Sequence, residues 1–176
     1  MKDKSFVFSA KGMDINMNNS AYIALGSNMG ERAENINRAV QAIAALPMTA
    51  VVKASNIYET APLGYSSQAD FYNAVIQVET EFSPEALLGA CLGIEAAMGR
   101  VREFVNGPRM IDLDLLIFGE ETRDTKELIL PHPRMRERSF VLVPLCDVLD
   151  SEEYKGLLNK LGREGVMQVN ERISGF

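Results

Sequence analysis

The spacing of hydrophobic residues predicts a strand followed by a helix near the start of the chain. Residues 21–25 form a short apolar run, and residues 26–30, Gly-Ser-Asn-Met-Gly, have the composition of a turn. Beyond this turn, apolar residues recur at helical spacing until Pro47, and they are Ala33, Ile36, Val40 and Ile43. We therefore expect the first strand to lead directly into a helix.

The middle of the chain predicts three further strands and a second helix. Residues 49–57 are rich in β-branched side chains, residues 72–80 alternate between apolar and polar side chains, and residues 111–118 form a strong apolar strand. Ser83 and Pro84 are typical of a helix N-terminus, and Gly99 is expected to end that helix. The apolar stripe of this helix is expected to hold Leu88, Cys91 and Met98.

This order of elements predicts an α+β fold with a ferredoxin-like antiparallel sheet and a βαββαβ core. Helices are expected on both faces of the sheet, which gives three layers, α/β/α. A long loop is expected at residues 61–70, and a further helix is expected after Asp150. Residues 1–19 lack sustained periodicity, so we expect a leader, a tag or a fusion remnant outside the fold, and residues 20–176 should form the domain.

Length and composition favour one ordinary globular domain. The chain has 176 residues, of which 47% are hydrophobic and 24% are charged. Cys91 and Cys146 are too few and too far apart for a disulfide framework, so buried free thiols are expected. No segment has the apolar core of a signal peptide or the length of a membrane span, and we therefore expect a cytoplasmic protein.

The charge distribution argues against a nucleic-acid partner and for a small polyanion. A net charge of −6 and a pI near 4.9 disfavour an extended basic surface. The arginines nevertheless gather in two stretches, which hold Arg100, Arg102 and Arg109 and then Arg134, Arg136 and Arg138. An acidic protein with such clusters can carry one locally cationic site.

Asp112 and Asp114 are the strongest candidates for a metal site. Residues two apart on a strand face the same way, so both carboxylates can reach one point. Mg²⁺ takes one or two carboxylates and completes its shell with water and phosphate oxygens. Plain exposed polar alternation is the alternative. Arg109, three residues earlier, favours a phosphate site because guanidinium groups match phosphate oxygens.

Three other features leave alternatives open. His132 is the only histidine, which excludes any site that needs two imidazoles, and it is either a phosphate contact or a structural turn residue. Glu95 falls on the apolar stripe of the second helix, where a structural ion pair and a functional role are both open. The turn at residues 26–30 matches neither GxxxxGK[ST] nor GxGxxG.

These residues in this order resemble the 6-hydroxymethyl-7,8-dihydropterin pyrophosphokinase family. The resemblance covers residues 21–150, and GPRxxDLDLL is its most specific signature. The matching stretches are YIALGSNMG at 22–30, YETAPLG at 58–64, DFYNAV at 70–75, GPRMIDLDLLIFG at 107–119 and LPHPRMRERSFVLVPL at 130–145.

The resemblance implies transfer of a diphosphate from ATP to the pterin hydroxymethyl oxygen, with release of AMP, in folate biosynthesis. It implies two Mg²⁺ ions held by Asp112 and Asp114, with Arg100 and Arg109 stabilising the transferred group. The implied ATP-binding residues are Glu95, Arg100, Arg102, Arg109, Leu115, His132 and Arg138. The implied pterin-binding residues are Gly26, Thr60, Ala61, Leu63, Phe71, Asn73, Asp112 and Phe140, with Asn73 reading the ring edge and Phe71 and Phe140 sandwiching the ring.

The chain departs from the family pattern at several positions. Ala61 and Phe71 stand where members often have proline and tyrosine, and the stretch 103–106 is short and lacks a tryptophan. Glu127 and Ile129 stand where some members contact ATP through arginine and threonine. These departures concern loop closure and nucleotide affinity.

Two other functions are weighed against the enzyme. A ferredoxin-like RNA-binding module is disfavoured by the acidic pI and by the absence of an aromatic RNP-like strand. A scaffold domain of a longer folate enzyme, with residues 1–19 as the scar of a fusion, is left open. The expected partners are the two small-molecule substrates, with no nucleic acid and no membrane, and the expected oligomeric state is a monomer.

Overall fold

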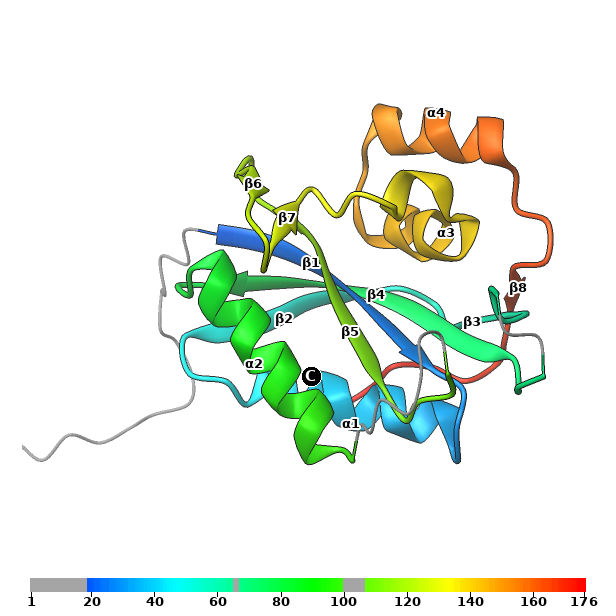
Figure 1. Cartoon of the computed structure of the whole chain (residues 1–176), viewed down its shortest axis with the longest axis horizontal. Coiled ribbons are helices and arrows are strands. Elements are labelled where there is room, and N and C mark those ends of the chain that lie inside the picture. Colours follow the sequence, from blue (N-terminus) through cyan, green and yellow to red (C-terminus); the bar gives the residue numbers. More distant parts are fainter. Residues whose placement is uncertain (1–18, 65–66, 100–106) are drawn as a thin grey trace, which may run out of the picture.

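The computed structural model describes residues 19–64, 67–99 and 107–176, and its centre is an antiparallel sheet with helices packed against it (Figure 1). The helices are α1 (Arg32–Ala44), α2 (Pro84–Ala97), α3 (Ser139–Val148) and α4 (Glu152–Leu161), with a 3-10 turn η1 (Met135–Glu137). The strands are β1 (Asn19–Ser27), β2 (Thr49–Ala54), β3 (Tyr58–Thr60), β4 (Phe71–Thr80), β5 (Asp112–Phe118), β6 (Arg123–Asp124), β7 (Ile129–Leu130) and β8 (Met167–Gln168).

The main sheet has the order β5-β1-β4-β3-β8, and β2 also pairs with β4. β1 lies between β5 and β4 and is antiparallel to both. β2 and β3 pair with opposite ends of the same side of β4. The predicted mixed fold with an antiparallel sheet is therefore confirmed.

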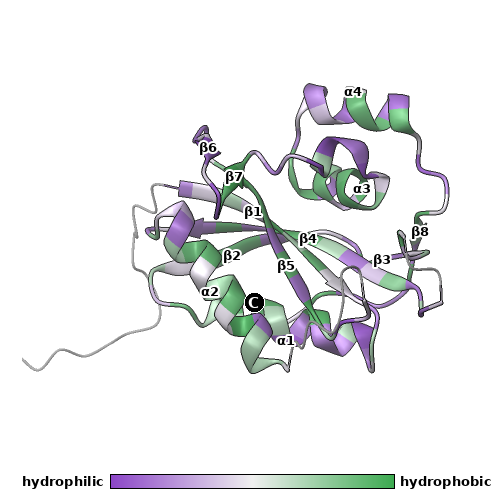
Figure 2. Ribbon diagram, in the orientation of Figure 1, coloured by the Kyte–Doolittle hydropathy of each residue, from purple (hydrophilic) through white to green (hydrophobic). Residues whose placement is uncertain are grey.

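The two faces of the sheet bury separate apolar clusters. Ile36 and Val40 of α1 pack with Cys91 of α2 and with Ile23 of β1 on one face. Leu142 of α3 and Leu158 of α4 belong to the cluster on the other face. Figure 2 shows hydrophobic residues along α2, α3 and the strands between them. The sheet is thus covered on both sides.

Several predicted boundaries move in the structure. The strand expected at 49–57 ends at Ala54 as β2, and a separate strand, β3, begins at Tyr58. Ser55 keeps the segment between them attached, since its N–H donates to the Val75 carbonyl and its Oγ accepts the Val75 N–H, each at 2.9 Å. On α2 the deeply buried leucine is Leu87 rather than Leu88. The helix expected after Asp150 is α4.

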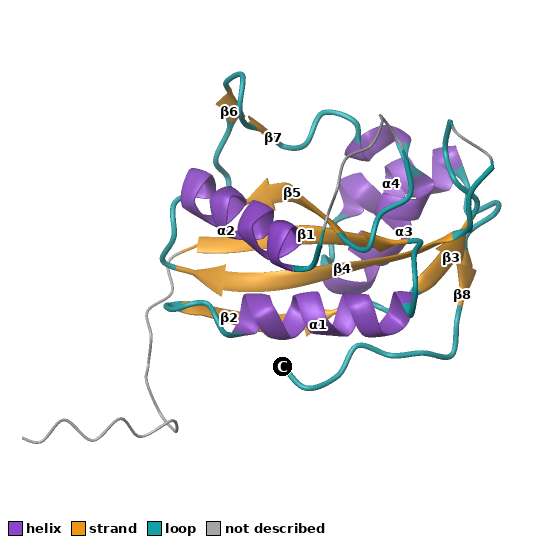
Figure 3. Cartoon of the chain, turned by 60° about the horizontal axis from the view of Figure 1, so that its bottom comes forward, coloured by secondary structure: helices purple, strands orange, loops and turns teal. Residues whose placement is uncertain are grey.

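The last residues of the chain return along the edge of the sheet. β8 pairs with β3, and the chain then runs beside α1 to the C-terminus (Figure 3). The Asn37 side chain on α1 donates to the Arg172 carbonyl at 3.1 Å and accepts the Ser174 N–H at 2.9 Å. No helix within residues 19–64, 67–99 and 107–176 is long and apolar enough to cross a membrane.

Candidate active site

One row of residues crosses the end of the sheet from its edge strand toward β3. Asp112 on β5 is opposite Gly26 on β1, Gly26 is opposite Asn73 on β4, and Asn73 is opposite Tyr58 on β3. A Cβ atom added at Gly26 would lie 3.5 Å from Asn73 Oδ1 and 3.9 Å from Asp112 Cβ. Because Gly26 has no side chain, an open floor lies between the Asp112 carboxylate and the Asn73 amide.

This floor belongs to a pocket of about 730 Å³ between the end of the sheet and the segment that leads into α3. All the residues predicted to bind the pterin line this pocket, and so do Asp114, Arg109, His132 and Arg138. Sequence reasoning assigned no site role to several other lining residues, which include Ala24, Met29, Pro108, Met110, Arg134 and Val141. Most of them lie inside the quoted sequence motifs.

The two aspartates point into the pocket because β5 alternates. Leu113 is buried in the cluster on the α1 and α2 face of the sheet, and the half-buried Asp112 and Asp114 face the opposite side. Glu95 of α2 is 3% exposed, and its Oε1 accepts the Leu113 N–H at 2.6 Å. Glu95 and Leu115 do not line the main pocket, so Glu95 contacts the strand between the aspartates from behind.

Arg109 connects the aspartate end of the pocket with an aromatic ring. Its Nη1 lies 3.4 Å from Asp112 Oδ2, and its guanidinium lies 5.3 Å from the centre of the Phe71 ring. Arg109 Nε is buried and has no hydrogen-bond partner within the described part of the chain. A buried donor without an acceptor is costly, so this position suits a ligand oxygen.

Asn73 is held in place by its neighbour on β3. Its Nδ2 donates to Thr60 Oγ1 at 2.8 Å, and both side chains are buried. Thr60 thus fixes which way the amide points, and Asn73 Oδ1 faces the open floor above Gly26. A fixed amide with a free acceptor and donor suits the edge of a planar heterocycle.

His132 and Arg138 lie on the other wall, and burial acts on both. Burial lowers the pKa of the His132 imidazole, while the Asp114 charge opposes that shift. Its Nδ1 accepts the Arg134 backbone N–H at 3.3 Å, and the His132 backbone N–H donates to the Leu116 carbonyl at 2.8 Å. The neutral ring therefore carries its proton on Nε2. Burial also lowers the pKa of Arg138, which lies 5.6 Å from the centre of the Phe140 ring.

Asn28 in the turn after β1 joins two loops of the pocket. Its Nδ2 donates to Gln68 Oε1 at 2.9 Å and to the Ala69 carbonyl at 3.1 Å, and its Oδ1 accepts the Arg109 N–H at 2.8 Å. The side chain is 3% exposed. The sequence predicted only a turn here, because the partners are far away along the chain.

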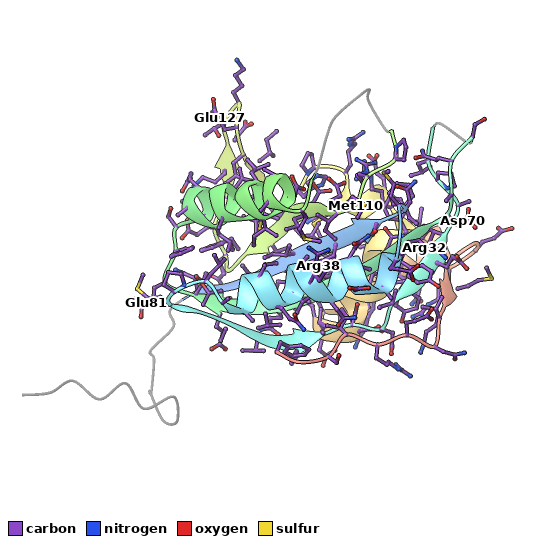
Figure 4. The ribbon with its side chains drawn as sticks, turned by 90° about the horizontal axis from the view of Figure 1, so that it is seen from below. Arg32, Arg38, Asp70, Glu81, Met110 and Glu127 are labelled. Atoms are coloured by element: carbon purple, nitrogen blue, oxygen red, sulfur yellow. The ribbon has the colours of Figure 1, made fainter. Side chains whose placement is uncertain are left out.

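Arg32 at the start of α1 holds the same loop from outside the pocket. It donates to the Asp70 carbonyl at 2.8 Å and pairs with Glu59 Oε1 at 2.7 Å. Figure 4 shows Arg32 and Asp70 at the same end of the molecule, away from Glu127. The 61–70 loop is therefore anchored where it enters β4.

A second, smaller hollow of about 250 Å³ adjoins the first. The two hollows share Asp114 and His132, and the second is lined by Leu88 and Leu115 together with residues 126–129. Leu115, predicted to bind ATP, thus lies in this hollow, as do Glu127 and Ile129. Arg100, Arg102 and the stretch 103–106 lie outside the described residues.

The protein alone offers few ligands to a metal ion. Among the residues that the structure describes, no cluster of three or more His, Cys, Asp or Glu side chains could hold one. Asp112 and Asp114 by themselves suit a cation that takes its remaining ligands from phosphate and water, which is the preference of Mg²⁺.

Comparison with known proteins identifies close relatives of this chain. The family model described as 7,8-dihydro-6-hydroxymethylpterin-pyrophosphokinase (HPPK) matches residues 22–150. The 2-amino-4-hydroxy-6-hydroxymethyldihydropteridine pyrophosphokinase of Bacillus subtilis is 45% identical over 150 residues, which are 85% of this chain and 90% of that protein. The protein of the same name from Methylorubrum extorquens is 44% identical over 154 residues, covering 85% of this chain and 98% of that protein.

Solved structures agree in fold. The Plasmodium falciparum HPPK-DHPS chain solved with pteroate superposes with a TM-score of 0.65 at 17% identity, covering 89% of this chain and 47% of that chain. This chain thus spans less than half of that solved protein. The Folic acid synthesis protein fol1 of Pneumocystis carinii is also similar, with 44% identity over 131 residues, which are 74% of this chain and 18% of that protein.

Proposed function

We propose that this chain, which belongs to the 7,8-dihydro-6-hydroxymethylpterin-pyrophosphokinase family, transfers a diphosphate from ATP to 6-hydroxymethyl-7,8-dihydropterin and releases AMP, a step of folate biosynthesis. The observation that carries the proposal is the single pocket in which the carboxylate pair Asp112 and Asp114 meets the amide of Asn73 across Gly26. One end of this pocket suits a magnesium phosphate and the other suits a planar heterocycle.

The pterin is proposed to bind at the Asn73 end. Its flat ring would lie between Phe71 and Phe140, both of which line the pocket, and aromatic faces stack well on such rings. Asn73, oriented by Thr60, would pair with the donor and acceptor groups of the ring edge. Gly26, Ala61 and Leu63 would complete the walls, and the open floor at Gly26 leaves room for the ring.

ATP is proposed to bind from the aspartate end toward the second hollow. Its phosphates would contact Arg109, Arg138 and His132, whose neutral imidazole offers Nε2–H as a donor. The unsatisfied Nε of Arg109 supports an oxygen ligand at that point. The adenine would enter the hollow beside Leu115, which shares Asp114 and His132 with the main pocket. The predicted roles of Arg100 and Arg102 stay part of the proposal.

The carboxylate pair fits Mg²⁺, and two ions are proposed, held by Asp112 and Asp114 with phosphate oxygens and water. When bound, magnesium neutralises phosphate charge and polarises the transferred group. Glu95 would keep the strand segment between the aspartates in register through the Leu113 N–H. It is therefore a positioning residue for the nucleotide end of the site.

The chain's own residues would act mainly by positioning and charge. The pterin hydroxymethyl oxygen forms a bond to the β-phosphorus of ATP, the bond from that phosphorus to the α,β-bridging oxygen breaks, and AMP leaves with those electrons. The hydroxyl proton passes to water, without a side chain acting as a general base. Arg109 and Arg100 would stabilise the charge on the transferred group, as expected for phosphoryl-type transfer.

We also propose a fold class, domain bounds and an oligomeric state. We describe the β1-α1-β2-β4-α2-β5 part as ferredoxin-like, supported by the sheet order and the antiparallel pairing. We assign residues 20–176 to this domain and expect it to act as a monomer in the cytoplasm. Fusion to a second folate enzyme stays open, because the HPPK-DHPS chains are longer relatives.

Product analysis tests the function directly. The purified chain is incubated with ATP, Mg²⁺ and reduced hydroxymethyl pterin, and the nucleotides are separated by chromatography. AMP and pterin diphosphate should appear in equal amounts. Formation of ADP, or no nucleotide turnover, would refute the proposal.

A pair of substitutions tests the pocket assignment. Asn73→Ala should raise the KM for the pterin by roughly 10- to 100-fold, because it removes the paired hydrogen bonds to the ring. Thr60→Val removes only the hydroxyl that orients Asn73, so its effect should be smaller and in the same direction. An equal rise in the KM for ATP would contradict the assignment of the pterin to the Asn73 end of the pocket.

A further inference from the structure

The side chains of the three arginines within residues 134–138 lie in three different environments, although the residues are close together in the sequence. Arg138 is half-buried in the wall of the pocket. Arg136 points elsewhere, since its Nη2 pairs with Glu153 Oε1 at 2.8 Å and its guanidinium lies 6.0 Å from the centre of the Tyr154 ring. Arg134 is exposed and lines the pocket together with Arg138 and His132.

Within the described part of the chain, Arg134 has no carboxylate partner. Within residues 19–64, 67–99 and 107–176, no carboxylate lies within ion-pair distance of its guanidinium, whereas Arg109, Arg123 and Arg136 all have such partners. Its backbone is fixed, because its N–H donates to His132 Nδ1 at 3.3 Å. The cation is therefore attached to a wall of the site and is left open toward the pocket.

Arg134 also contributes positive potential to the groups around it. Burial is the main reason why the pKa values of His132 and Arg138 are lowered, and the Arg134 charge lowers both further. All three residues line the same pocket. Like charges that share a space repel each other. Asp112 and Asp114 oppose this potential, but in the proposed function their charge is taken up by magnesium. An anion with several oxygens would relieve the repulsion.

We propose that Arg134 is a further ATP-binding residue, whose guanidinium contacts the phosphate oxygens of the nucleotide at the mouth of the pocket. The inference rests on the proposed function and adds a residue to it. The contact is assigned to the nucleotide because the Arg134 backbone N–H donates to His132, and His132 borders both hollows.

Binding is measured by calorimetry with Mg²⁺ and the α,β-methylene analogue of ATP, which is not cleaved. Arg134→Gln should weaken binding about 5- to 30-fold, the loss expected for a charge-assisted hydrogen bond at a partly exposed site. Arg134→Lys keeps the charge and should recover most of the affinity. The salt dependence of binding should also be shallower for Arg134→Gln, because one ionic contact is gone.

Arg136→Gln is the matched control, since it removes the same group from the same turn but outside the pocket. It should bind the analogue as the unmodified chain does. Equal losses in the two variants, or unchanged binding by Arg134→Gln, would overturn the inference, and so would an equal loss of pterin affinity. These results are distinct from failure of the proposed function, which would be seen as absence of AMP with the unmodified chain.

Discussion

Replacing Asn28 by alanine should weaken the fold and the pocket together. The change removes three side-chain hydrogen bonds, to Gln68 Oε1, to the Ala69 carbonyl and from the Arg109 N–H. At about 1 kcal/mol each, and more where a buried partner stays unsatisfied, the free energy of unfolding should fall by about 2–4 kcal/mol. Urea unfolding followed by circular dichroism measures this loss.

The same variant should bind the pterin about tenfold more weakly, because the 61–70 loop loses its bonds to Asn28 and the Arg109 loop keeps only the bond from the Asn28 backbone N–H to the Arg109 carbonyl. Asn28→Asp distinguishes the effect of the hydrogen bond from the Arg109 N–H from that of the bonds to Gln68 and Ala69. Its carboxylate still accepts the Arg109 N–H but cannot donate to Gln68 or Ala69. It should therefore lose pterin affinity and keep most of its affinity for the ATP analogue.

Asn37→Ala provides a matched control on α1. Asn37 also makes three side-chain hydrogen bonds, to Ala33, Arg172 and Ser174, and none of them reaches the pocket. This variant should lose about 1–2 kcal/mol of stability and bind the pterin normally. Pterin binding by Asn28→Ala within twofold of the unmodified chain would contradict the expected link between the Asn28 hydrogen bonds and pterin affinity. An equal loss of affinity in Asn37→Ala would contradict it too.

Three further predictions concern the carboxylates and the thiols. Asp114→Asn should lower kcat at least 100-fold with an unchanged melting temperature, and near-normal turnover would exclude this carboxylate from metal binding. Glu95→Ala should lower the free energy of unfolding by about 2–4 kcal/mol, because the Leu113 N–H loses a charged acceptor; a stability within 0.5 kcal/mol would contradict that role. Burial raises the pKa of the Cys91 thiol to about 12, so a thiol reagent at pH 8 should leave Cys91 unmodified in the folded protein and label it in urea. Labelling of Cys91 as fast as of the half-buried Cys146 would show that the helix opens readily.

The sequence was most informative where apolar residues recur at a regular spacing. α1 has apolar residues at helical spacing and β4 at every second position, and both form close to the expected boundaries. α3 was not predicted, because it packs between the sheet and α4 and is apolar on nearly all sides. Pro144 inside α3 adds a signal against a helix. Periodicity cannot identify a helix that has no polar face.

The candidate site also holds some residues whose position the sequence predicts and others whose position it does not. Asp112 and Asp114 were predictable because alternation along a strand fixes their common direction. The position of Arg134 inside the pocket and of Arg136 outside it was not, since the two lie in an irregular turn. The role of Asn28 was also hidden, because its partners are 40 to 81 residues away in the sequence. Such contacts depend on how the loops meet in space.

The edge of the sheet at β5 has a further consequence for solubility. An edge strand exposes unpaired backbone groups that another chain can extend, which leads to aggregation. Here Glu95 accepts the outward Leu113 N–H, and the His132 backbone N–H donates to the Leu116 carbonyl. Both contacts come from segments that also build the site. Substitutions made to alter catalysis at Glu95 are therefore expected to increase self-association as well, by uncovering the strand that carries the two aspartates.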